Sequence, residues 1–279
     1  MMNHKSSKIT GIIFRYVIFV LIFLFAIFPI YWIISCSFRD TAEIQKSTIS
    51  VIPKTFTLIH YVEAFTEIGL VKSMQNSLII TIGTIIITIP LGLLCAYAFS
   101  KINFRGSATM QFLVMVTQFI PVVAYIVPLY LIMSKLHLLN TIYSLWITYL
   151  ATAYPMATIL LMGYIQDVPD SLEEAARIDG CSRIQAMIKI VFPLAMPGIV
   201  TSSIFVFISI WQEYFIATSF VNQDKARTVS MAMQKFVSRH GTNWGGIMAA
   251  SVIGAIPVVI LFMLSRKKLT DNLAGGVKG

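Results

Sequence analysis

The segment PDSLEEAARIDG, at positions 169–180, lies between two apolar runs at positions 142–165 and 198–220. Each run is long enough to cross a bilayer, because about 20 apolar residues span the hydrocarbon core as a helix. The segment between them is net acidic and has two alanines at its centre. This order predicts a membrane protein in which two spanning helices are joined by a polar segment outside the bilayer.

The rest of the chain repeats the pattern and predicts an all-α, polytopic membrane protein. Of the 279 residues, 57% are hydrophobic and only 12% are charged, whereas soluble domains carry roughly 25% charged residues. We expect one transmembrane domain over residues 1–279, with little chain left for a soluble domain. Its six predicted spans are at about 14–36, 76–99, 110–133, 142–165, 198–220 and 245–265.

Basic residues mark the cytoplasmic side of a membrane protein, and their positions here predict its orientation. Lys101 and Arg105 follow the second run, and a basic cluster at 266–268 follows the sixth. We therefore expect a multi-pass protein of the plasma or inner membrane with both termini in the cytoplasm. The first run should be a retained span, since its roughly 20 residues exceed the 7–15 of a signal-peptide core.

The composition also argues against several classes of function. The net charge of +9 comes from basic residues at the ends of the spans, not from one basic stripe of the kind that binds nucleic acid. Histidines at positions 4, 60, 137 and 240 are scattered, so we expect no catalytic cluster, metal site or cofactor. The three cysteines fall in different compartments, so we expect no structural disulfide.

The polar segment at 166–197 predicts a helix, a turn and a second helix in the cytosol. Ser171 and Glu174 have the spacing of a capping box, which starts a helix over 172–179. Gly180 then occupies the position where a left-handed turn would end that helix. Ser182 and Gln185 repeat the capping-box spacing, and the second helix is expected to reach Phe192.

We expect the first helix of this segment to present a docking surface. Its exposed side chains would be Glu173, Glu174, Arg177 and Asp179, and the small Ala175 and Ala176 let another protein approach closely. The alternative is an amphipathic helix that lies on the lipid surface. Such helices usually carry Lys and Arg on their polar side, so the net acidic charge favours a protein partner.

These residues carry a specific resemblance. Glu174-Ala175-Ala176, Gly180 and Ile190-Val191-Phe192-Pro193 are similar to the signature loop of binding-protein-dependent ATP-binding-cassette importers, with Phe192 in the place of a leucine. Further matches point to the carbohydrate branch and to permease subunits of the maltose-permease inner-subunit kind. They are Asn76-Ser77-Leu78, Ala96-Tyr97-Ala98-Phe99, Phe104-Arg105-Gly106, Pro128-Leu129-Tyr130, Trp211-Gln212-Glu213-Tyr214, Asn243-Trp244-Gly245, Met248-Ala249-Ala250 and the terminal run 274–279.

The resemblance implies a permease subunit that translocates a sugar or oligosaccharide. Its implied partners are a second homologous permease subunit, an ATPase dimer that hydrolyses ATP, and an extracellular or periplasmic solute-binding protein. The coupling residues that contact the ATPase would be Glu173, Glu174, Ala175, Ala176, Arg177, Asp179 and Gly180. The resemblance also places the loop 221–244 against the solute-binding protein and the tail 273–279 against the ATPase. The chain has no Gly-x4-Gly-Lys-Ser/Thr phosphate loop, so we expect no ATP hydrolysis by the chain itself.

Candidate residues for the solute path combine aromatic rings with amides and a carboxylate. Glu213 is the one ionisable side chain expected inside a span, where it must face protein or a water-filled cavity. For Glu213 a structural role within the bundle is the alternative, and each of the others is also compatible with plain packing. The candidates are Gln118, Tyr125, Tyr154, Trp211, Gln212 and Glu213.

Two other functions compete with an importer subunit. A secondary transporter or channel would commonly show inverted repeats and several ionisable residues at mid-membrane, and neither pattern is present here. A membrane enzyme would need His, Asp or Glu clustered in one plane. The importer subunit is therefore the function that the sequence predicts.

Overall fold

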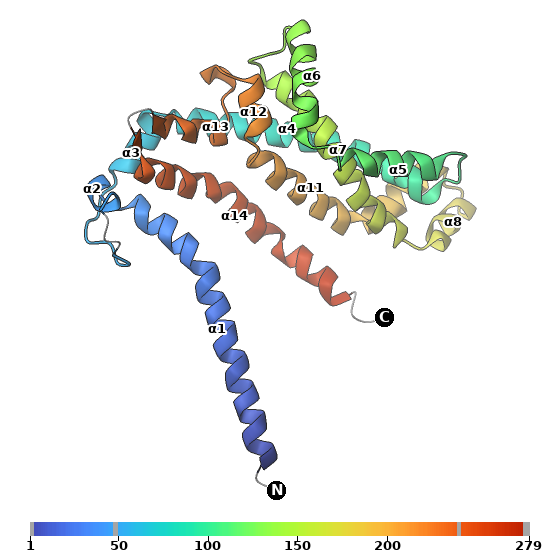
Figure 1. The fold of residues 1–279 in the computed structure, drawn as a ribbon. Helices are drawn as coiled ribbons and strands as arrows, with labels where there is room; N and C mark the ends of the chain where they lie inside the picture. The colour runs from blue at the N-terminus through green and yellow to red at the C-terminus, as the bar shows by residue number, and fades with distance from the viewer. Residues whose placement is uncertain (1–2, 47–49, 239–240, 276–279) are drawn as a thin grey trace. The chain divides into compact units, whose positions relative to one another are not determined.

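The computed structural model describes residues 3–46, 50–238 and 241–275, which are almost entirely helical (Figure 1). The chain divides into two units. The first unit comprises residues 1–70 and 233–255, and the second comprises 71–232 and 256–279. The all-α fold expected from the apolar runs is confirmed.

The first unit is built around two long helices and a small hairpin. Its elements are α1 (Asn3–Ser37), α2 (Thr41–Ile44), α3 (Ile59–Thr66), a 3-10 turn at Gln234–Phe236, β1 (Val237–Ser238), β2 (Gly241–Thr242) and the first part of α14 (Trp244–Gly275). The two strands pair antiparallel, with Val237 opposite Thr242 and Ser238 opposite Gly241. The predicted loop 221–244 therefore ends in a hairpin.

The second unit holds the remaining helices, apart from the shared α14. They are α4 (Leu70–Lys101), α5 (Ser107–Thr117), α6 (Val122–Lys135), α7 (Ile142–Gln166), α8 (Asp170–Ile178), α9 (Arg183–Ala186), a π-helix at Met187–Val191, α10 (Phe192–Leu194), α11 (Met196–Trp211), α12 (Phe215–Phe220), a 3-10 turn at Asp224–Ala226 and α13 (Val229–Met233). Apolar side chains of α4, α6, α7, α11 and α12 share one core, in which Leu145 and Tyr149 of α7 are buried. A second core joins α4 and α7 to the helices that follow α8.

Glycines let α4 and α11 pack closely against α7. A Cβ on Gly83 would lie 2.7 Å from the Trp146 indole, and a Cβ on Gly198 would lie 2.4 Å from the Tyr164 ring. The Trp146 indole N–H also donates to the carbonyl of Ile80, at 3.1 Å. Small residues of this kind allow membrane helices to approach without strain.

Four helices of the described residues are long and apolar enough to cross a membrane, and six spans result if two bent helix pairs each count as one. The segment of the expected span 110–133 is bent, because α5 and α6 meet at an angle of 93°. Pro121 lies at this break; it lacks an N–H and disfavours helical backbone at the residue before it. The expected span 198–220 is also interrupted, because α11 ends at Trp211 and α12 begins at Phe215.

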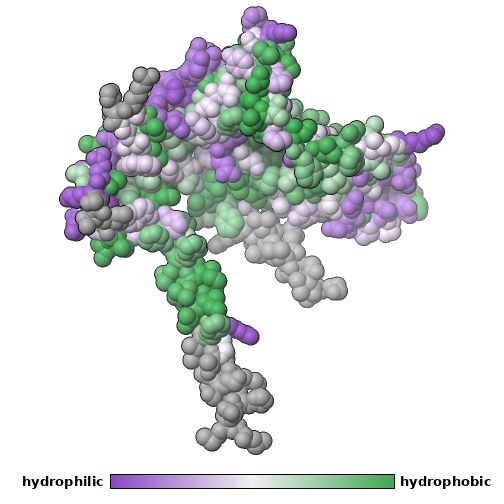
Figure 2. All heavy atoms as spheres, in the orientation of Figure 1, coloured by the Kyte–Doolittle hydropathy of each residue, from purple (hydrophilic) through white to green (hydrophobic). Residues whose placement is uncertain are grey.

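The outer surfaces of the spans are apolar. Side chains along α1 and α6 form green surfaces in Figure 2, and hydrophilic side chains gather over the end of the second unit that holds α8. The most apolar window of α1, within Phe14–Ser37, is 0% buried by the rest of the chain. Lipid or another subunit must cover this surface, since an exposed apolar helix is unstable in water.

Candidate coupling loop and solute cavity

The first helix of the polar segment begins two residues earlier than predicted. α8 starts at Asp170 after Pro169, and no side chain caps it, so the expected capping box of Ser171 and Glu174 is wrong. Ser171 instead lies inside the first turn. Asp170 and Glu173 in that turn place negative charge at the positive end of the helix dipole.

The turn at Gly180 has the geometry that the sequence predicts. Gly180 has φ +91°, a value that side chains with a Cβ rarely adopt. The amide of Cys181 donates to the carbonyl of Ala176 at 3.0 Å, and the amide of Gly180 donates to Arg177 at 3.2 Å. These two bonds form a Schellman motif, which ends α8 and reverses the chain.

The second predicted capping box is present. The Ser182 hydroxyl accepts from the amide of Gln185, and the Gln185 side chain accepts from the amide of Ser182 at 2.8 Å. The helix that follows is continuous to Leu194, but its middle, Met187–Val191, is a π-helix. The loop is therefore a rigid helix–turn–helix whose direction is set by Gly180.

The exposed face of α8 differs from the predicted one at a single acidic residue. Glu174, Arg177 and Asp179 are exposed, as are Ala175 and Gly180, while Ala176 is half-buried. Glu173 is only 7% exposed, which contradicts its predicted place on the surface.

An apolar side chain completes the exposed face. Ile178 is 86% exposed, the highest exposure among the large hydrophobic residues of the described chain. It lies at the end of α8, two residues before Gly180. Sequence reasoning missed Ile178, although an isoleucine beside a turn glycine in a polar segment is a visible signal.

The buried Glu173 belongs to a polar network at the Lys101 end of α4. Its Oε1 accepts a 2.6 Å hydrogen bond from the hydroxyl of Tyr97, which is 4% exposed. Arg183 Nε donates to the same hydroxyl at 3.4 Å and lies 3.9 Å from the carboxylate. Arg183 Nη2 also donates to the carbonyl of Lys101 at 2.8 Å. Tyr97 is part of the sequence resemblance to the importer family, but no local pattern predicted its contact with Glu173.

Two of the predicted solute residues lie in one cavity of the second unit. Gln118 and Glu213 line a cavity of about 240 Å³ together with Tyr149 and Thr152. A second cavity, of about 400 Å³, is lined by Gln118, Tyr125 and Thr152. Gln118 and Thr152 border both cavities, and Gln118 lies in the break between α5 and α6. The break between α5 and α6 therefore places the polar side chain of Gln118 at both cavities.

The carboxylate of Glu213 is held by three donors. Its Oε1 accepts from the amide of Ile216 at 2.8 Å, and its Oε2 accepts from the amide of Ala217 at 3.1 Å. The Tyr149 hydroxyl donates to Oε2 at 2.7 Å. Glu213 therefore caps the start of α12, which fits the structural alternative for this residue better than direct recognition of a solute.

The other three predicted solute residues line neither cavity. Trp211 is 6% exposed and its ring stacks on Phe207 with centroids 5.5 Å apart. Gln212 is exposed beyond the end of α11, and Tyr154 is half-buried in α7.

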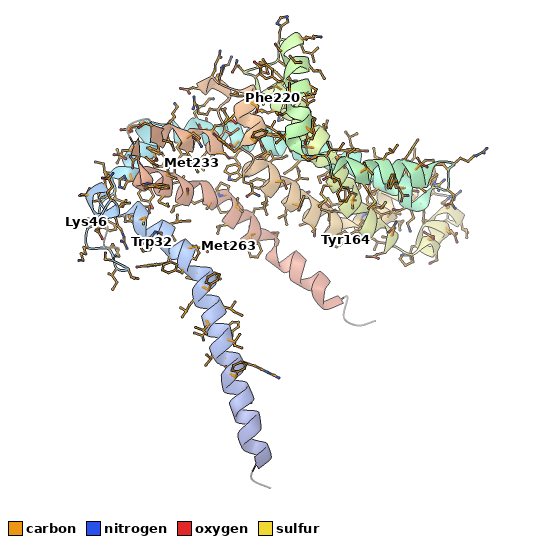
Figure 3. The ribbon with its side chains drawn as sticks, viewed as in Figure 1. Trp32, Lys46, Tyr164, Phe220, Met233 and Met263 are labelled. Carbon is orange, nitrogen blue, oxygen red and sulfur yellow. The ribbon has the colours of Figure 1, made fainter. Side chains whose placement is uncertain are left out.

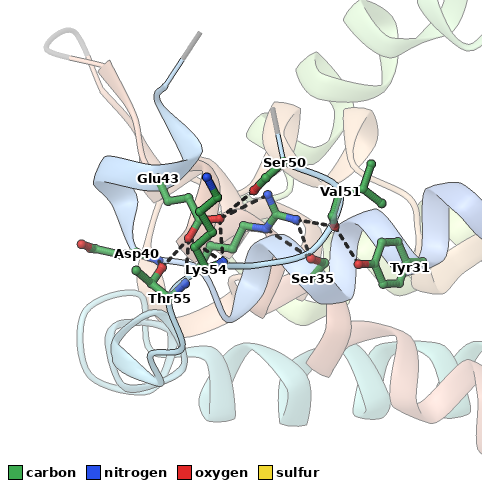
Figure 4. Close-up of polar contacts among 9 residues, drawn as sticks. Tyr31, Ser35, Asp40, Glu43, Ser50, Val51, Lys54 and Thr55 are labelled. Carbon is green, nitrogen blue, oxygen red and sulfur yellow. Dashed lines mark hydrogen bonds and ion pairs between the residues drawn. The ribbon is translucent and has the colours of Figure 1, made fainter. Parts of the chain in front are cut away.

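The segment that follows α1 in the first unit contains a buried arginine. Arg39 is 2% exposed, and it donates to Ser35 Oγ at 2.9 Å and to the carbonyl of Val51 at 2.9 Å (Figure 4). Its guanidinium lies 4.9 Å from the centre of the Trp32 ring. Trp32, Arg39 and Trp244 line a cavity of about 330 Å³. In Figure 3, Trp32 projects from the end of α1 that approaches α2.

Glu43 joins Arg39 to the segment 50–55. Its carboxylate lies 3.6 Å from Arg39 and accepts from the amides of Lys54 and Thr55 and from the Thr55 hydroxyl at 2.6 Å (Figure 4). The hydroxyl of Thr55 is the main cause that lowers the pKa of Glu43 from 4.5 to about 2, and the amide of Lys54 adds to it. The ionised carboxylate of Glu43 therefore holds the segment 50–55 by hydrogen bonds.

His60 is completely buried between α3 and the start of α14. Its Nε2 lies 2.9 Å from the carbonyl of Arg39, and its Nδ1 lies 3.2 Å from Glu63 Oε2. Asn243 donates to the same Glu63 oxygen at 2.8 Å and accepts from the amide of Gly246. A Cβ on Gly245 would lie 2.1 Å from the His60 ring. The run Asn243-Trp244-Gly245 is thus explained by packing and capping.

No group of three or more His, Cys, Asp or Glu side chains that could hold a metal ion occurs among the residues described. His240 and the end of the tail, residues 276–279, lie outside them. Cys36, Cys95 and Cys181 are free thiols. The candidate sites are therefore the loop around Gly180 and the cavities around Gln118.

Comparison with known proteins gives consistent matches over nearly the whole chain. The family model of the binding-protein-dependent transport system inner membrane component matches residues 88–274. The sulfoquinovosyl glycerol transport system permease protein SmoH of Agrobacterium fabrum is 33% identical, over 98% of this chain and 96% of that protein. The trehalose/maltose transport system permease protein MalG of Thermococcus litoralis is 32% identical, over 93% and 94%.

The fold matches solved importers as well. The crystal structure of a bacterial ABC transporter involved in the import of the acidic polysaccharide alginate contains a chain that superposes with a TM-score of 0.80 at 24% identity, covering 94% of this chain and 97% of that one. A chain of the MetNI methionine ABC transporter in an inward-facing conformation superposes with a TM-score of 0.58 at 16% identity, covering 71% and 92%.

Proposed function

Because the chain belongs to the family of binding-protein-dependent transport system inner membrane components, we propose that it is the permease subunit through which an ATP-binding-cassette importer moves a sugar or oligosaccharide. Relatives with 31–33% identity support the sugar class, since they serve sulfoquinovosyl glycerol, diacetylchitobiose and trehalose or maltose. In this proposal the chain is not an enzyme and takes no cofactor, and ATP is hydrolysed by a separate subunit.

The single observation that carries the proposal is the rigid loop around Gly180. A Schellman turn and a capping box hold α8 and α9 at a defined angle. α8 presents Glu174, Arg177 and Ile178 together on an exposed surface. Exposed apolar area with charges at its rim is typical of a protein interface. This surface is the proposed contact with one subunit of an ATPase dimer.

The remaining partners follow from the other surfaces of the chain. The exposed apolar surfaces of the spans supply area for a second homologous permease subunit and for lipid. The hairpin of β1 and β2 belongs to the long segment after α12 and is the proposed contact with an extracellular or periplasmic solute-binding protein. This assignment places α8 and both termini in the cytoplasm, with that segment outside.

We assign the solute path to the cavities around Gln118. The Gln118 amide and the Tyr125 phenol offer hydrogen-bond groups and an aromatic face, which suit a sugar ring. Glu213 contributes by orienting Tyr149 and the start of α12, rather than by binding the sugar itself. Replacing Gln118 by alanine should raise the KM of uptake without lowering the rate of ATP hydrolysis at saturating solute.

The proposed coupling surface is tested with Glu174→Lys in the assembled transporter. We expect normal membrane insertion, but uptake reduced at least about tenfold, because like charges brought together at an interface cost several kcal/mol. Lys189→Glu is the matched control, since Lys189 is an exposed charge on the other helix of the loop. Uptake that remains normal in Glu174→Lys would remove this role for α8.

The importer class is tested with proteoliposomes that contain the whole transporter. Uptake should require ATP, persist with a protonophore and stop with vanadate. Uptake that a protonophore abolishes would instead identify a secondary transporter. Purification of the chain together with an ATPase gives a faster test of the same assignment.

A further inference from the structure

The polar network of Tyr97, Glu173 and Arg183 joins α8 to α4, a helix that is not adjacent to it in the chain. Tyr97 and Glu173 are separated by 76 residues, and both side chains are buried. Buried hydrogen bonds to a charged group are stronger than those on the surface, because water does not compete for the carboxylate. The contact therefore resists separation of α8 from the end of α4.

Arg183 strengthens this junction from the second helix of the loop. The last carbonyl groups of a helix have no partner within it. Arg183 donates to one of these, the carbonyl of Lys101 at the end of α4. Its positive charge is also favourable at this end of the helix dipole. Both helices of the loop, α8 and α9, are thus bonded to the same end of α4.

A second pair at this junction is much weaker. The ammonium of Lys101 is bonded to Asp170 and to the carbonyl of Val168. The side chain of Lys101 is 5% exposed, but that of Asp170 is 76% exposed, so water competes for this carboxylate and weakens the pair. Tyr97 and Glu173 consequently make the stronger contact of the junction. A substitution at Asp170 removes the weaker contact and serves as the control.

The opposite end of α4 is bonded to the external segment 225–229. The side-chain amide of Asn76 donates to the carbonyls of Lys225 and Arg227, each at 3.0 Å. The hydroxyl of Ser77 accepts from the amide of Val229 at 2.9 Å. Asn76 and Ser77 are both buried. At a rise of 1.5 Å per residue, roughly 30 Å of helix separates this contact from Tyr97.

We propose that α4 transmits the movement of the loop around Gly180 to the external segment 225–229. At the cytosolic end, the Tyr97–Glu173–Arg183 junction bonds α4 to the loop. At the external end, Asn76 and Ser77 bond α4 to the segment 225–229. This inference rests on the proposed function for the source of the movement, the ATPase. It assigns Tyr97, Glu173 and Asn76 as positioning residues, since none of them lines the cavities around Gln118.

The first experiment measures hydrogen exchange of the full-length chain in the assembled transporter. Tyr97→Phe should raise amide exchange in α8 about tenfold, the order expected when a buried hydrogen bond to a carboxylate is lost. Glu173→Gln keeps an acceptor for Tyr97 and should give a smaller rise. Asp170→Asn and Tyr164→Phe are controls, because the hydroxyl of Tyr164 on α7 donates to Thr201 and not to Glu173 (Figure 3).

The second experiment measures solute transported per ATP hydrolysed in proteoliposomes. Tyr97→Phe and Asn76→Ala should each lower this ratio at least about fivefold, with ATP hydrolysis itself changed less than twofold. The ratio in the double variant should be no lower than in either single variant, since both substitutions interrupt the same coupling through α4. Asp170→Asn and Tyr164→Phe should leave the ratio unchanged.

The outcomes separate this inference from the proposed function. If the wild-type assembly couples ATP hydrolysis to uptake but Tyr97→Phe keeps the full ratio, transmission through α4 is wrong. It is also wrong if the two losses add in the double variant, or if exchange in α8 does not change. If the wild-type assembly shows no ATP-driven uptake, the proposed function fails, while the exchange experiment still tests the junction.

Discussion

Tyr149 of α7 donates a 2.7 Å hydrogen bond to Glu213, which caps the start of α12. Tyr149 is 1% exposed, so its ring and hydroxyl are fixed within the core of the second unit. The pair connects two spans 64 residues apart at the edge of the cavity that contains Gln118. The carboxylate in this membrane span is therefore a structural element that shapes the cavity.

Tyr149→Phe removes one of the three donors to the Glu213 carboxylate. We expect a loss of about 1–2 kcal/mol in stability, the range for hydrogen bonds to charged groups in membrane proteins. The KM for uptake should change less than in Gln118→Ala, because the lost hydroxyl is bonded to Glu213 and the ring that lines the cavity is kept. Thermal unfolding of the purified protein checks the first result. Tyr143→Phe, at a 60% exposed tyrosine, is the control, and an altered KM with unchanged stability would contradict the structural role.

Gly180→Ala introduces a Cβ at φ +91°. Left-handed backbone costs a residue with a side chain roughly 1 kcal/mol more than glycine. We expect the turn between α8 and α9 to change its angle, so uptake should fall several-fold while membrane insertion is normal. Gly163→Ala is the control, since Gly163 lies in α7 with no atom near the added Cβ. Equal uptake by both variants would show that the turn angle is unimportant.

Gly245→Ala places a methyl group against the buried ring of His60, 2.1 Å from its Nε2. The ring is held by Arg39 and Glu63 and has no room to move. Overpacking of this kind costs about 1–3 kcal/mol, so the thermal midpoint should drop measurably. Gly11→Ala, at a helical glycine with open space around it, should be neutral. A stable Gly245→Ala protein would mean that α3 can shift away from α14.

The hydrogen bonds between Glu43 and the segment 50–55 should weaken in acid, and the folded protein should lose stability. Its pKa is lowered from 4.5 to about 2 in the folded protein. A carboxyl with a lowered folded pKa stabilises the fold above its ordinary pKa, and this contribution is lost as the pH falls from about 4.5 towards 2. The thermal midpoint of the wild type should fall through this window. Glu43→Gln should start lower at pH 7 and lose less over the same range; parallel curves for the two proteins would exclude Glu43 as the cause.

The sequence predicted local features best where one residue type determines the geometry. Gly180 was expected in the left-handed region, and the capping box of Ser182 and Gln185 was expected from its spacing; both are present. The first capping box is absent because α8 begins directly after Pro169, two residues before the predicted start, so Ser171 lies inside the helix. Periodicity and composition were sufficient for the all-α membrane fold.

Features that depend on distant residues were not predictable from the local pattern. Glu173 looks like a surface acid, and its burial depends on Tyr97, which is 76 residues away. Glu213 looks like a solute ligand until Tyr149 is known to be its partner. The 93° angle between α5 and α6 at Pro121 is likewise not specified by the local sequence pattern. No single sequence window contains this information.

The exposure of α1 has a consequence for biosynthesis. The most apolar window of this helix buries nothing against its own chain, so its entry into the bilayer does not depend on later segments. A span that partitions into lipid by its own hydrophobicity inserts before the bundle forms. α1 is therefore expected to enter lipid on its own, whereas the packing of the His60 ring against Gly245 follows only after α14 has been translated.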